Sequence, residues 1–218
     1  MALWLPEPAS AEAFGWLVLA AIFGVVIYRS VSKAKRQIGA AKASPAAWDA
    51  AATANGWVVN EPGKPLIEGQ GEGFTFTAGL RRAVKSRGDM ADKILAYTWI
   101  VVKFTAPLPL IFDIRYPRRP VNYRPEVSEV KVNGFGDRRF TLQAADGAAQ
   151  ALEHWVSTTG LAGLMGPMVT KETSQLAVTF EEVIDEHSEW LAEPEAIAAF
   201  VNAACDLASE IRESLDGA

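Results

Sequence analysis

Few side chains in this 218-residue sequence could carry out chemistry, and the best-placed group is Asp185, His187 and Glu189. Their alternate spacing puts all three on one face if the segment is extended. Two carboxylates and an imidazole arranged in this way could ligate a divalent metal ion. Three further glutamates lie in the same stretch, so a solvated acidic turn would also account for the pattern. The sequence therefore predicts either a metal site or an acidic turn at this place.

The remaining sequence contains little that catalysis requires. The second histidine, His154, falls on the polar face of an expected helix beside Glu153, and the single cysteine, Cys205, is expected to be a small buried residue. One cysteine cannot form an internal disulfide bond, which agrees with a reducing compartment. Because no serine-centred elbow, Walker loop or metalloprotease motif occurs, we predict a protein that is not an enzyme and binds no cofactor.

A glycine-rich segment at positions 67–76, IEGQGEGFTF, raises the question of a nucleotide-binding loop. Its glycine spacing is GxGxG, and the residues after it alternate as in a strand. A phosphate cradle instead needs the N-terminus of a helix directly after the loop. We therefore expect a hairpin or a bulge in this segment.

One uncharged apolar run, Ala13–Tyr28, is unlike any other part of the chain. As a helix it would be about 24 Å long, slightly shorter than a hydrocarbon core of about 30 Å. Flanking residues can extend it, so we predict a transmembrane helix over residues 13–31. Aromatic rings near both ends suit the membrane interface, and a small-xxx-small pair could let two such helices approach each other. The residues assigned to this anchor are Trp16, Ala20, Gly24, Tyr28 and Arg29.

The flanking charges set the orientation of the predicted anchor. Only acidic residues precede the run, whereas five basic residues follow it between positions 29 and 42. The positive-inside rule then places the N-terminus outside the cell and the rest of the chain in the cytoplasm. A cleaved signal peptide would show the reverse charge order, and a buried soluble helix would have a polar face. The residues expected to contact lipid headgroups are Arg29, Lys33, Lys35 and Arg36.

The chain beyond the anchor has the pattern of one α+β domain. We expect a short extracytoplasmic segment over 1–12, the transmembrane helix over 13–31, a basic linker over 32–43 and a cytoplasmic domain over 44–218. Within that domain we predict a mostly antiparallel sheet packed with about three helices. The expected helices are 44–54, 146–158 and 194–215. The expected strands are 57–59, 80–86, 94–104, 110–116, 127–132, 139–142 and 176–183.

Two features of this pattern set the expected connections. The linkers between the middle strands are too short for a crossover helix, which predicts an antiparallel meander. Glycines and a proline at positions 160–167 predict a loop. Each helix is expected to bury one stripe. These stripes are Trp48, Ala51 and Ala52; Ala148, Ala149, Leu152, Trp155 and Val156; and Ile197, Phe200, Val201, Ala204, Leu207, Ala208 and Ile211.

The net charge of −5 is distributed unevenly. Residues 61–139 carry 14 basic and nine acidic side chains, whereas residues 140–218 carry two basic and 14 acidic ones. Such an acidic C-terminal part argues against nucleic acid as a partner. The basic side chains of the middle part either face lipid headgroups or protect strand edges and loops. They include Arg81, Arg82, Lys85, Arg87, Arg118, Arg119 and Arg124.

Several short motifs recur together from Trp48 onward. A helix ends at Asn55-Gly56-Trp57, a glycine-rich hairpin precedes basic residues, and Pro107-Leu108-Pro109 leads into a strand. Phe140-Thr141-Leu142 then precedes the alanine-rich helix at Asp146–Val156. On these motifs the chain resembles a group of uncharacterised single-pass membrane proteins of actinobacteria and their phages. The resemblance implies a membrane-tethered α+β domain and carries over no functional residue.

These observations predict a membrane-anchored cytoplasmic domain that binds the lipid bilayer and a protein partner or a second copy of itself. A phage or prophage origin would imply a role at the host envelope, such as superinfection exclusion. The alternative is an inner-leaflet module that binds lipid or another ligand. An enzyme with a metal at Asp185, His187 and Glu189 is the third hypothesis.

Overall fold

A computed structural model of the chain describes residues 45–61, 63–87, 90–117, 127–129, 140–145 and 147–216. The chain divides into two compact units, Met1–Lys42 and Ala43–Ala218, and the described residues belong to the second. The predicted segments 1–12, 13–31 and 32–43 therefore lie outside the described residues. The residues assigned to the anchor and to headgroup contacts also lie outside the described residues: Trp16, Ala20, Gly24, Tyr28, Arg29, Lys33, Lys35 and Arg36. So do three basic residues of the middle part, Arg118, Arg119 and Arg124. No helix among the described residues is both long and apolar enough to cross a membrane.

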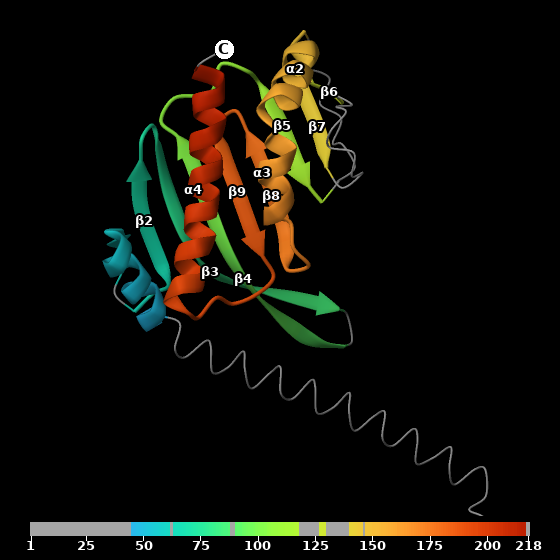
Figure 1. Cartoon of the computed structure of the whole chain (residues 1–218). Coiled ribbons are helices and arrows are strands. Elements are labelled where there is room, and N and C mark those ends of the chain that lie inside the picture. The colour runs from blue at the N-terminus through green and yellow to red at the C-terminus, as the bar shows by residue number, and fades with distance from the viewer. Residues whose placement is uncertain are drawn as a thin grey trace, which may run out of the picture. The chain divides into compact units, whose positions relative to one another are not determined.

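The second unit has an α+β fold, as predicted. Its described part holds a nine-stranded sheet in the order β1-β2-β3-β4-β9-β8-β5-β7-β6, with antiparallel pairing at each contact. Helices α2, α3 and α4 lie across one face of this sheet (Figure 1). The strands are Val58–Val59, Leu66–Gly71, Phe74–Arg87, Met90–Phe104, Phe112–Tyr116, Val127–Glu129, Thr141–Ala145, Thr173–Thr179 and Glu182–His187 for β1 to β9. The helices are Ala149–Thr159 (α2), Leu161–Met168 (α3) and Pro194–Asp216 (α4), and residues 45–55 are also helical.

The glycine-rich segment forms the expected hairpin, in which β2 and β3 pair from Leu66↔Gly79 to Gly71↔Phe74. The turn uses Gly73, whose φ of 76° is costly for residues with a Cβ. A Cβ at Gly71 would collide with the ring of Phe74. The glycines therefore leave room for aromatic rings of the core.

The three predicted helices are confirmed, and so are their buried stripes except at Ala148 and Ala149, which are half-buried at the start of α2. The stripe of α4 is almost fully buried, since Ile197, Val201, Ala204 and Ala208 are each 0 % exposed. Helix α4 packs against β3, β4 and β9, and α2 packs against β7. The sheet contributes alternate residues to the same core, as the 3.6- and 2-residue periods require.

Three expectations about connections are wrong. The meander ends at β4, because β4 pairs next with β9 and not with β5. The predicted loop at 160–167 is helix α3, which turns away from α2 at Gly160 (φ 67°) and buries Leu161 and Met165. The predicted single strand 176–183 is a hairpin of β8 and β9. Its turn is held by the Thr179 hydroxyl, which accepts hydrogen bonds from the backbone N–H groups of residues 181 and 182.

Strands β3 and β4 extend well past their neighbours and form a two-stranded projection (Figure 1). Pairing with β2 reaches Gly79, and pairing with β9 begins at Thr98. Residues 81–87 and 90–97 pair with each other beyond these points. We call this segment the β-arm. Among the described strands, none pairs with either of its outer edges.

Candidate functional site

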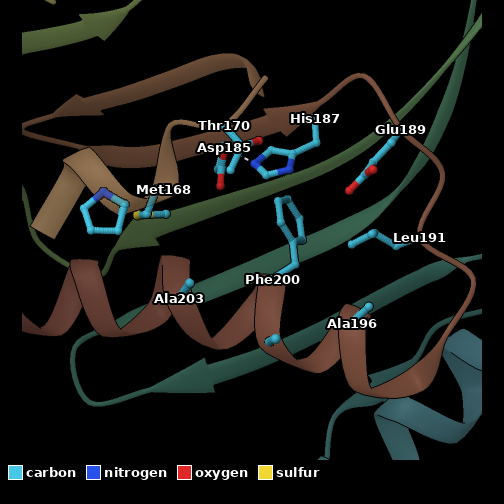
Figure 2. A pocket seen from close by; sticks show the side chains of 11 residues that line it. Met168, Thr170, Asp185, His187, Glu189, Leu191, Ala196, Phe200 and Ala203 are labelled. Carbon is cyan, nitrogen blue, oxygen red and sulfur yellow. Dashed lines mark ion pairs between the residues drawn. The ribbon is translucent and has the colours of Figure 1, made fainter. Parts of the chain in front are cut away.

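A pocket of about 310 Å³ lies between α4, the end of β9 and the loops that follow α3 and β9 (Figure 2). The chain reaches it because β9 is central in the sheet and α4 crosses over β4 and β9. All three residues of the predicted acidic group line this pocket. The lining residues are Pro167, Met168, Thr170, Asp185, His187, Glu189, Leu191, Ala196, Ala199, Phe200 and Ala203.

Asp185 and His187 form the polar floor of the pocket. They alternate along β9, opposite Ile100 and Thr98 of β4, so both point to the side covered by α4. The Asp185 side chain is 2 % exposed and that of His187 is 13 % exposed. A solvated acidic turn is therefore wrong, because this segment is an interior strand.

The contact between these two residues is an ion pair when His187 is protonated. His187 Nε2 lies 3.3 Å from Asp185 Oδ1, yet Oδ1 has no hydrogen-bond partner among the described residues. The separation is long for a hydrogen bond to a charged group. A buried carboxylate oxygen with an unfilled lone pair is thus present at the pocket floor.

Burial and charge shift the titration of both groups. Desolvation raises the pKa of Asp185, more than the contact with His187 lowers it. Burial alone would lower the pKa of His187, but Asp185, Glu189 and Glu172 outweigh this and raise it. The folded protein therefore holds protons at this pair to higher pH than the isolated side chains would.

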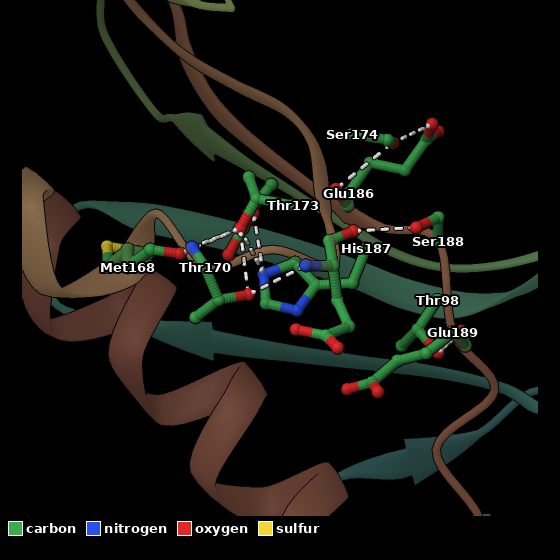
Figure 3. A network of polar contacts seen from close by, with 11 residues as sticks. Thr98, Met168, Thr170, Thr173, Ser174, Glu186, His187, Ser188 and Glu189 are labelled. Carbon is green, nitrogen blue, oxygen red and sulfur yellow. Dashed lines mark hydrogen bonds and ion pairs between the residues drawn. The ribbon is translucent and has the colours of Figure 1, made fainter. Parts of the chain in front are cut away.

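The His187 ring is fixed on two further sides. It packs edge-on against the ring of Phe200 on α4, with centroids 5.0 Å apart and planes at 70°. Its Nε2 also lies 3.4 Å from Thr173 Oγ1 at the start of β8. The ring consequently bridges the sheet and the helix that cover the pocket (Figures 2 and 3).

Thr98 fixes the loop at the rim of the pocket. Its fully buried hydroxyl donates to the Glu189 carbonyl (2.8 Å) and accepts from the Leu191 N–H (3.1 Å). The side chain of Glu189 is exposed, whereas that of Leu191 is half-buried. This one hydroxyl therefore positions both the charged and the apolar part of the rim.

Thr173 holds the opposite rim in the same way. Its hydroxyl donates to the Met168 carbonyl (3.0 Å) and accepts from the Thr170 N–H (2.9 Å). Ser188 closes this network, because its N–H and hydroxyl both donate to the Glu172 carbonyl (Figure 3). The pocket is thus bounded by hydrogen-bonded loops.

The pocket combines an acidic floor and rim with apolar walls. The walls come from Pro167, Met168, Leu191 and Phe200, and from alanines of α4. Asp185 and Glu189 supply its carboxylates, while its described lining includes no lysine or arginine. An apolar cavity with a few convergent polar groups has the usual composition of a small-ligand site.

The metal hypothesis is not supported by this geometry. Asp185, His187 and Glu189 line one pocket, but β9 ends at His187 and Glu189 belongs to the loop. Within the described ranges, no group of three or more His, Cys, Asp or Glu side chains could hold a metal ion. His154 is exposed on α2, and Cys205 is partly buried in α4 with a pKa raised to about 12 by burial, as befits an unreactive thiol.

The other face of the sheet has mixed charge. Glu186 points away from the pocket, where it pairs with Arg81 and accepts from Ser174 Oγ (2.6 Å). Asp113 pairs with Arg115 on the same face, at 2.7 Å. The described part of this face therefore does not form the uniformly basic surface that lipid headgroups would favour.

Sequence reasoning missed two kinds of residue at this site. Thr98 and Thr173 sit within ordinary strand patterns, and only tertiary pairing reveals their role. Ala196, Ala199 and Ala203 do leave a signal, since their i, i+3, i+7 spacing defines a face of α4 beside its core stripe. A row of small residues next to a buried stripe indicates space, but not what fills it.

The fold and the pocket together define a two-layer α+β domain with a ligand-sized cavity. No family model matches this chain, and no curated protein matches it. Among solved structures, it is similar to the crystal structure of the mycobacterial trehalose monomycolate transport factor A, TtfA. The identity is 8 % and the TM-score 0.46, over 78 % of this chain and 93 % of that chain. A likeness at this level gives no guide to function.

Proposed function

We propose that residues 43–218 form a binding domain whose pocket takes a small organic ligand, and that the N-terminal segment holds this domain at the cytoplasmic face of a membrane. The observation that carries the proposal is the almost fully buried Asp185 carboxyl group in the lining of an apolar pocket, with one oxygen that has no hydrogen-bond partner in the described structure. A buried carboxyl group that is incompletely hydrogen-bonded is costly, and a ligand that donates to this carboxyl would offset that cost.

Binding fits this pocket better than catalysis does. Thr170 supplies the hydroxyl of the described lining, and that oxygen already contacts the Thr173 hydroxyl (3.3 Å) and the Glu172 N–H (3.2 Å). It is therefore not poised beside His187 as a nucleophile. A pocket with a fixed polar floor and no activated nucleophile is suited to holding a ligand.

The binding proposal is tested by screening small fragments of varied charge against ¹⁵N-labelled protein. We expect ligand-dependent shifts that cluster on β9 and α4. Ala203→Leu should abolish them by filling the pocket. Asn202→Leu places the same side chain one position along, at an exposed residue outside the pocket lining, and should leave the shifts in place. Absence of any pocket ligand in such a screen would refute the proposed function.

The membrane part of the proposal is supported by the apolar run Ala13–Tyr28 and the basic residues after it. Full-length protein is expected in the carbonate-resistant membrane fraction, and a chain lacking residues 1–42 in the soluble fraction. In cells or spheroplasts, a tag at the C-terminus should be protected from external protease. A digested C-terminal tag would contradict the assigned orientation.

A second candidate function is protein binding through the β-arm. Both outer edges of residues 81–87 and 90–97 lack a partner strand among the described residues, and such edges can accept a strand from another chain. A role at a host envelope, such as superinfection exclusion, would act through such a partner. The support for this envelope role is the resemblance to membrane proteins of actinobacteria and their phages.

Crosslinking in intact cells, followed by pull-down from solubilised membranes, tests the protein-binding function. The informative variant replaces residues 84–94 with Asn-Gly, which suits a two-residue hairpin closed by the Ala83↔Leu95 pair. We expect a reproducible partner to disappear with this variant while ligand binding in the pocket persists. A partner that survives the shortening would exclude the β-arm as its site.

A further inference from the structure

We infer that the ligand of this pocket is an organic ammonium, a protonated amine on a short aliphatic stem. The inference rests on the proposed function of the same pocket and adds the chemical class of its ligand. It depends on three features of the described residues: the buried oxygen of Asp185, the sign of the charges that face the cavity, and the shape of its walls.

The floor of the pocket requires a hydrogen-bond donor. Asp185 is 2 % exposed, and its Oδ1 has no hydrogen-bond partner among the described residues. A carboxylate accepts hydrogen bonds and donates none when ionised. An ammonium group supplies three donors and a full positive charge, so it suits this carboxylate better than an alcohol does.

The charges around the cavity select against an anion. A ligand carboxylate or phosphate would meet Asp185 at the floor and Glu189 at the rim. The one basic group of the described lining is His187, and three carboxylates, those of Asp185, Glu189 and Glu172, already act on it. For the same reason a phospholipid amine headgroup is disfavoured, because its phosphate would lie near Glu189.

The walls fit a short aliphatic stem. One wall of the pocket consists of small side chains of α4, those of Ala196, Ala199 and Ala203. Leu191 and Phe200 also line the pocket. A volume of about 310 Å³ is at the lower end of the 300–1,000 Å³ typical of ligand pockets. The Phe200 ring can also attract a cation through its face.

Protonation of His187 should oppose binding of such a cation. The groups that face His187 are Asp185 on β9, Glu189 in the following loop and Glu172 before β8, while α4 and β4 face it with Phe200 and Thr98. The ammonium and the His187 proton would share the same carboxylates. Affinity for the amine should therefore rise with pH as His187 loses its proton, until the amine itself deprotonates.

The test compares butylammonium, 1-butanol and butyrate, which share one stem. Binding is measured by NMR shifts and calorimetry on the full chain in phosphatidylcholine–phosphatidylglycerol nanodiscs. We expect the amine to bind at least about tenfold more tightly than the alcohol, because only the amine brings a positive charge to the buried carboxylate. Butyrate should show no shifts at β9.

Two variants separate this inference from a folding defect. Asp185→Asn should weaken the amine by more than about tenfold and leave butanol unchanged. Glu189→Gln changes an exposed rim charge and should weaken the amine about two- to fivefold without affecting stability. Glu153→Gln, exposed on α2, is the matched control and should have no effect.

The outcomes are distinguishable. Butanol or butyrate binding as tightly as the amine would overturn the ammonium inference while leaving the pocket a ligand site. Binding of none of the three would also overturn it, and the fragment screen would then decide the proposed function. An amine affinity that falls as pH rises from 6 to 8 would contradict the competition with His187.

Discussion

Most buried polar side chains among the described residues lie at the end of β9 and on the strands beside it, while Thr141 lies apart on β7. Thr98, Asp185 and Glu186 are each less than 9 % exposed. Two of them are satisfied by hydrogen bonds, while Asp185 keeps an oxygen that is not. Since burying a polar group without a partner is costly, the proposed ligand would offset a cost that the fold bears at Asp185.

The hydroxyl of Thr98 should contribute measurably to stability. Thr98→Val keeps the shape but leaves the Glu189 carbonyl and the Leu191 N–H without their buried partner. We expect a loss of about 1–3 kcal/mol in the free energy of unfolding, measured by urea titration. Thr53→Val is the control, because its exposed hydroxyl bonds only to the Asp49 carbonyl of its own helix. It should change stability by less than about 0.5 kcal/mol.

The stability of the fold should depend on the proton held by His187. Because its pKa is raised in the folded state, protonation stabilises the fold below the unfolded pKa of about 6.5, and this contribution is lost as pH rises through the folded pKa. The raised pKa of Asp185 acts in the same direction. The free energy of unfolding should therefore fall as pH is raised from 6 to 9.

The same prediction can be checked at the histidine itself. In an NMR titration, the His187 ring should titrate above pH 6.5. The sequence has two histidines, so the histidine signals that remain in the His154→Gln variant belong to His187. Asp185→Asn removes a charge that favours the imidazolium and leaves burial, which opposes it. The His187 midpoint should then move down and the pH dependence of stability should flatten. A midpoint unchanged by Asp185→Asn would contradict the ion pair.

At the scale of elements, α2 and α3 offer a test of why two helices form where one helix and a loop were expected. Gly160 separates them at φ 67°, whereas Gly163 lies inside α3, and neither has an atom within 4 Å of an added Cβ. Gly160→Ala should destabilise by about 1–2 kcal/mol. Gly163→Ala should stabilise by about 0.5–1 kcal/mol. Thermal unfolding of both variants measures the difference, and the same sign for both would refute this explanation.

The elements that could be predicted from the sequence are those with a strong local period. The stripe of α4 and the dense strand ending at Phe104 are visible without any tertiary information. Helix α3 could not be predicted in this way, because glycines and Pro167 normally interrupt helices. Burial of Leu161 and Met165 accounts for the helix at this place. The β8–β9 turn depends on one threonine hydroxyl, which has no periodic signal.

The candidate site was predictable only in part, for the same reason. The spacing of Asp185 and His187 indicated a shared face, and they do share one. Their burial was not predictable, because it follows from β9 lying between β4 and β8. Phe200 was assigned to the core stripe, and its contact with His187 depends on how α4 crosses the sheet.

At the scale of the whole molecule, the described sheet and core lie within Ala43–Ala218. A chain that begins at residue 43 is therefore expected to fold by itself, with a Tm within about 2 °C of the full-length protein in the same detergent. Circular dichroism melts of both chains measure this. A chain that ends at residue 192 lacks the stripe of α4 and should show no cooperative transition.

Because β4 pairs with β9, one edge of β4 stays uncovered during part of the chain's synthesis. During synthesis β4 is complete when residue 104 has been made, but the strand that covers its edge arrives roughly 80 residues later, about 4–16 s at 5–20 residues per second. Until then the nascent chain offers a long, apolar strand edge to chaperones or to its neighbours. A premature stop codon between residues 104 and 182, which leaves β4 without β9, should therefore harm the cell's protein balance more than one before residue 90.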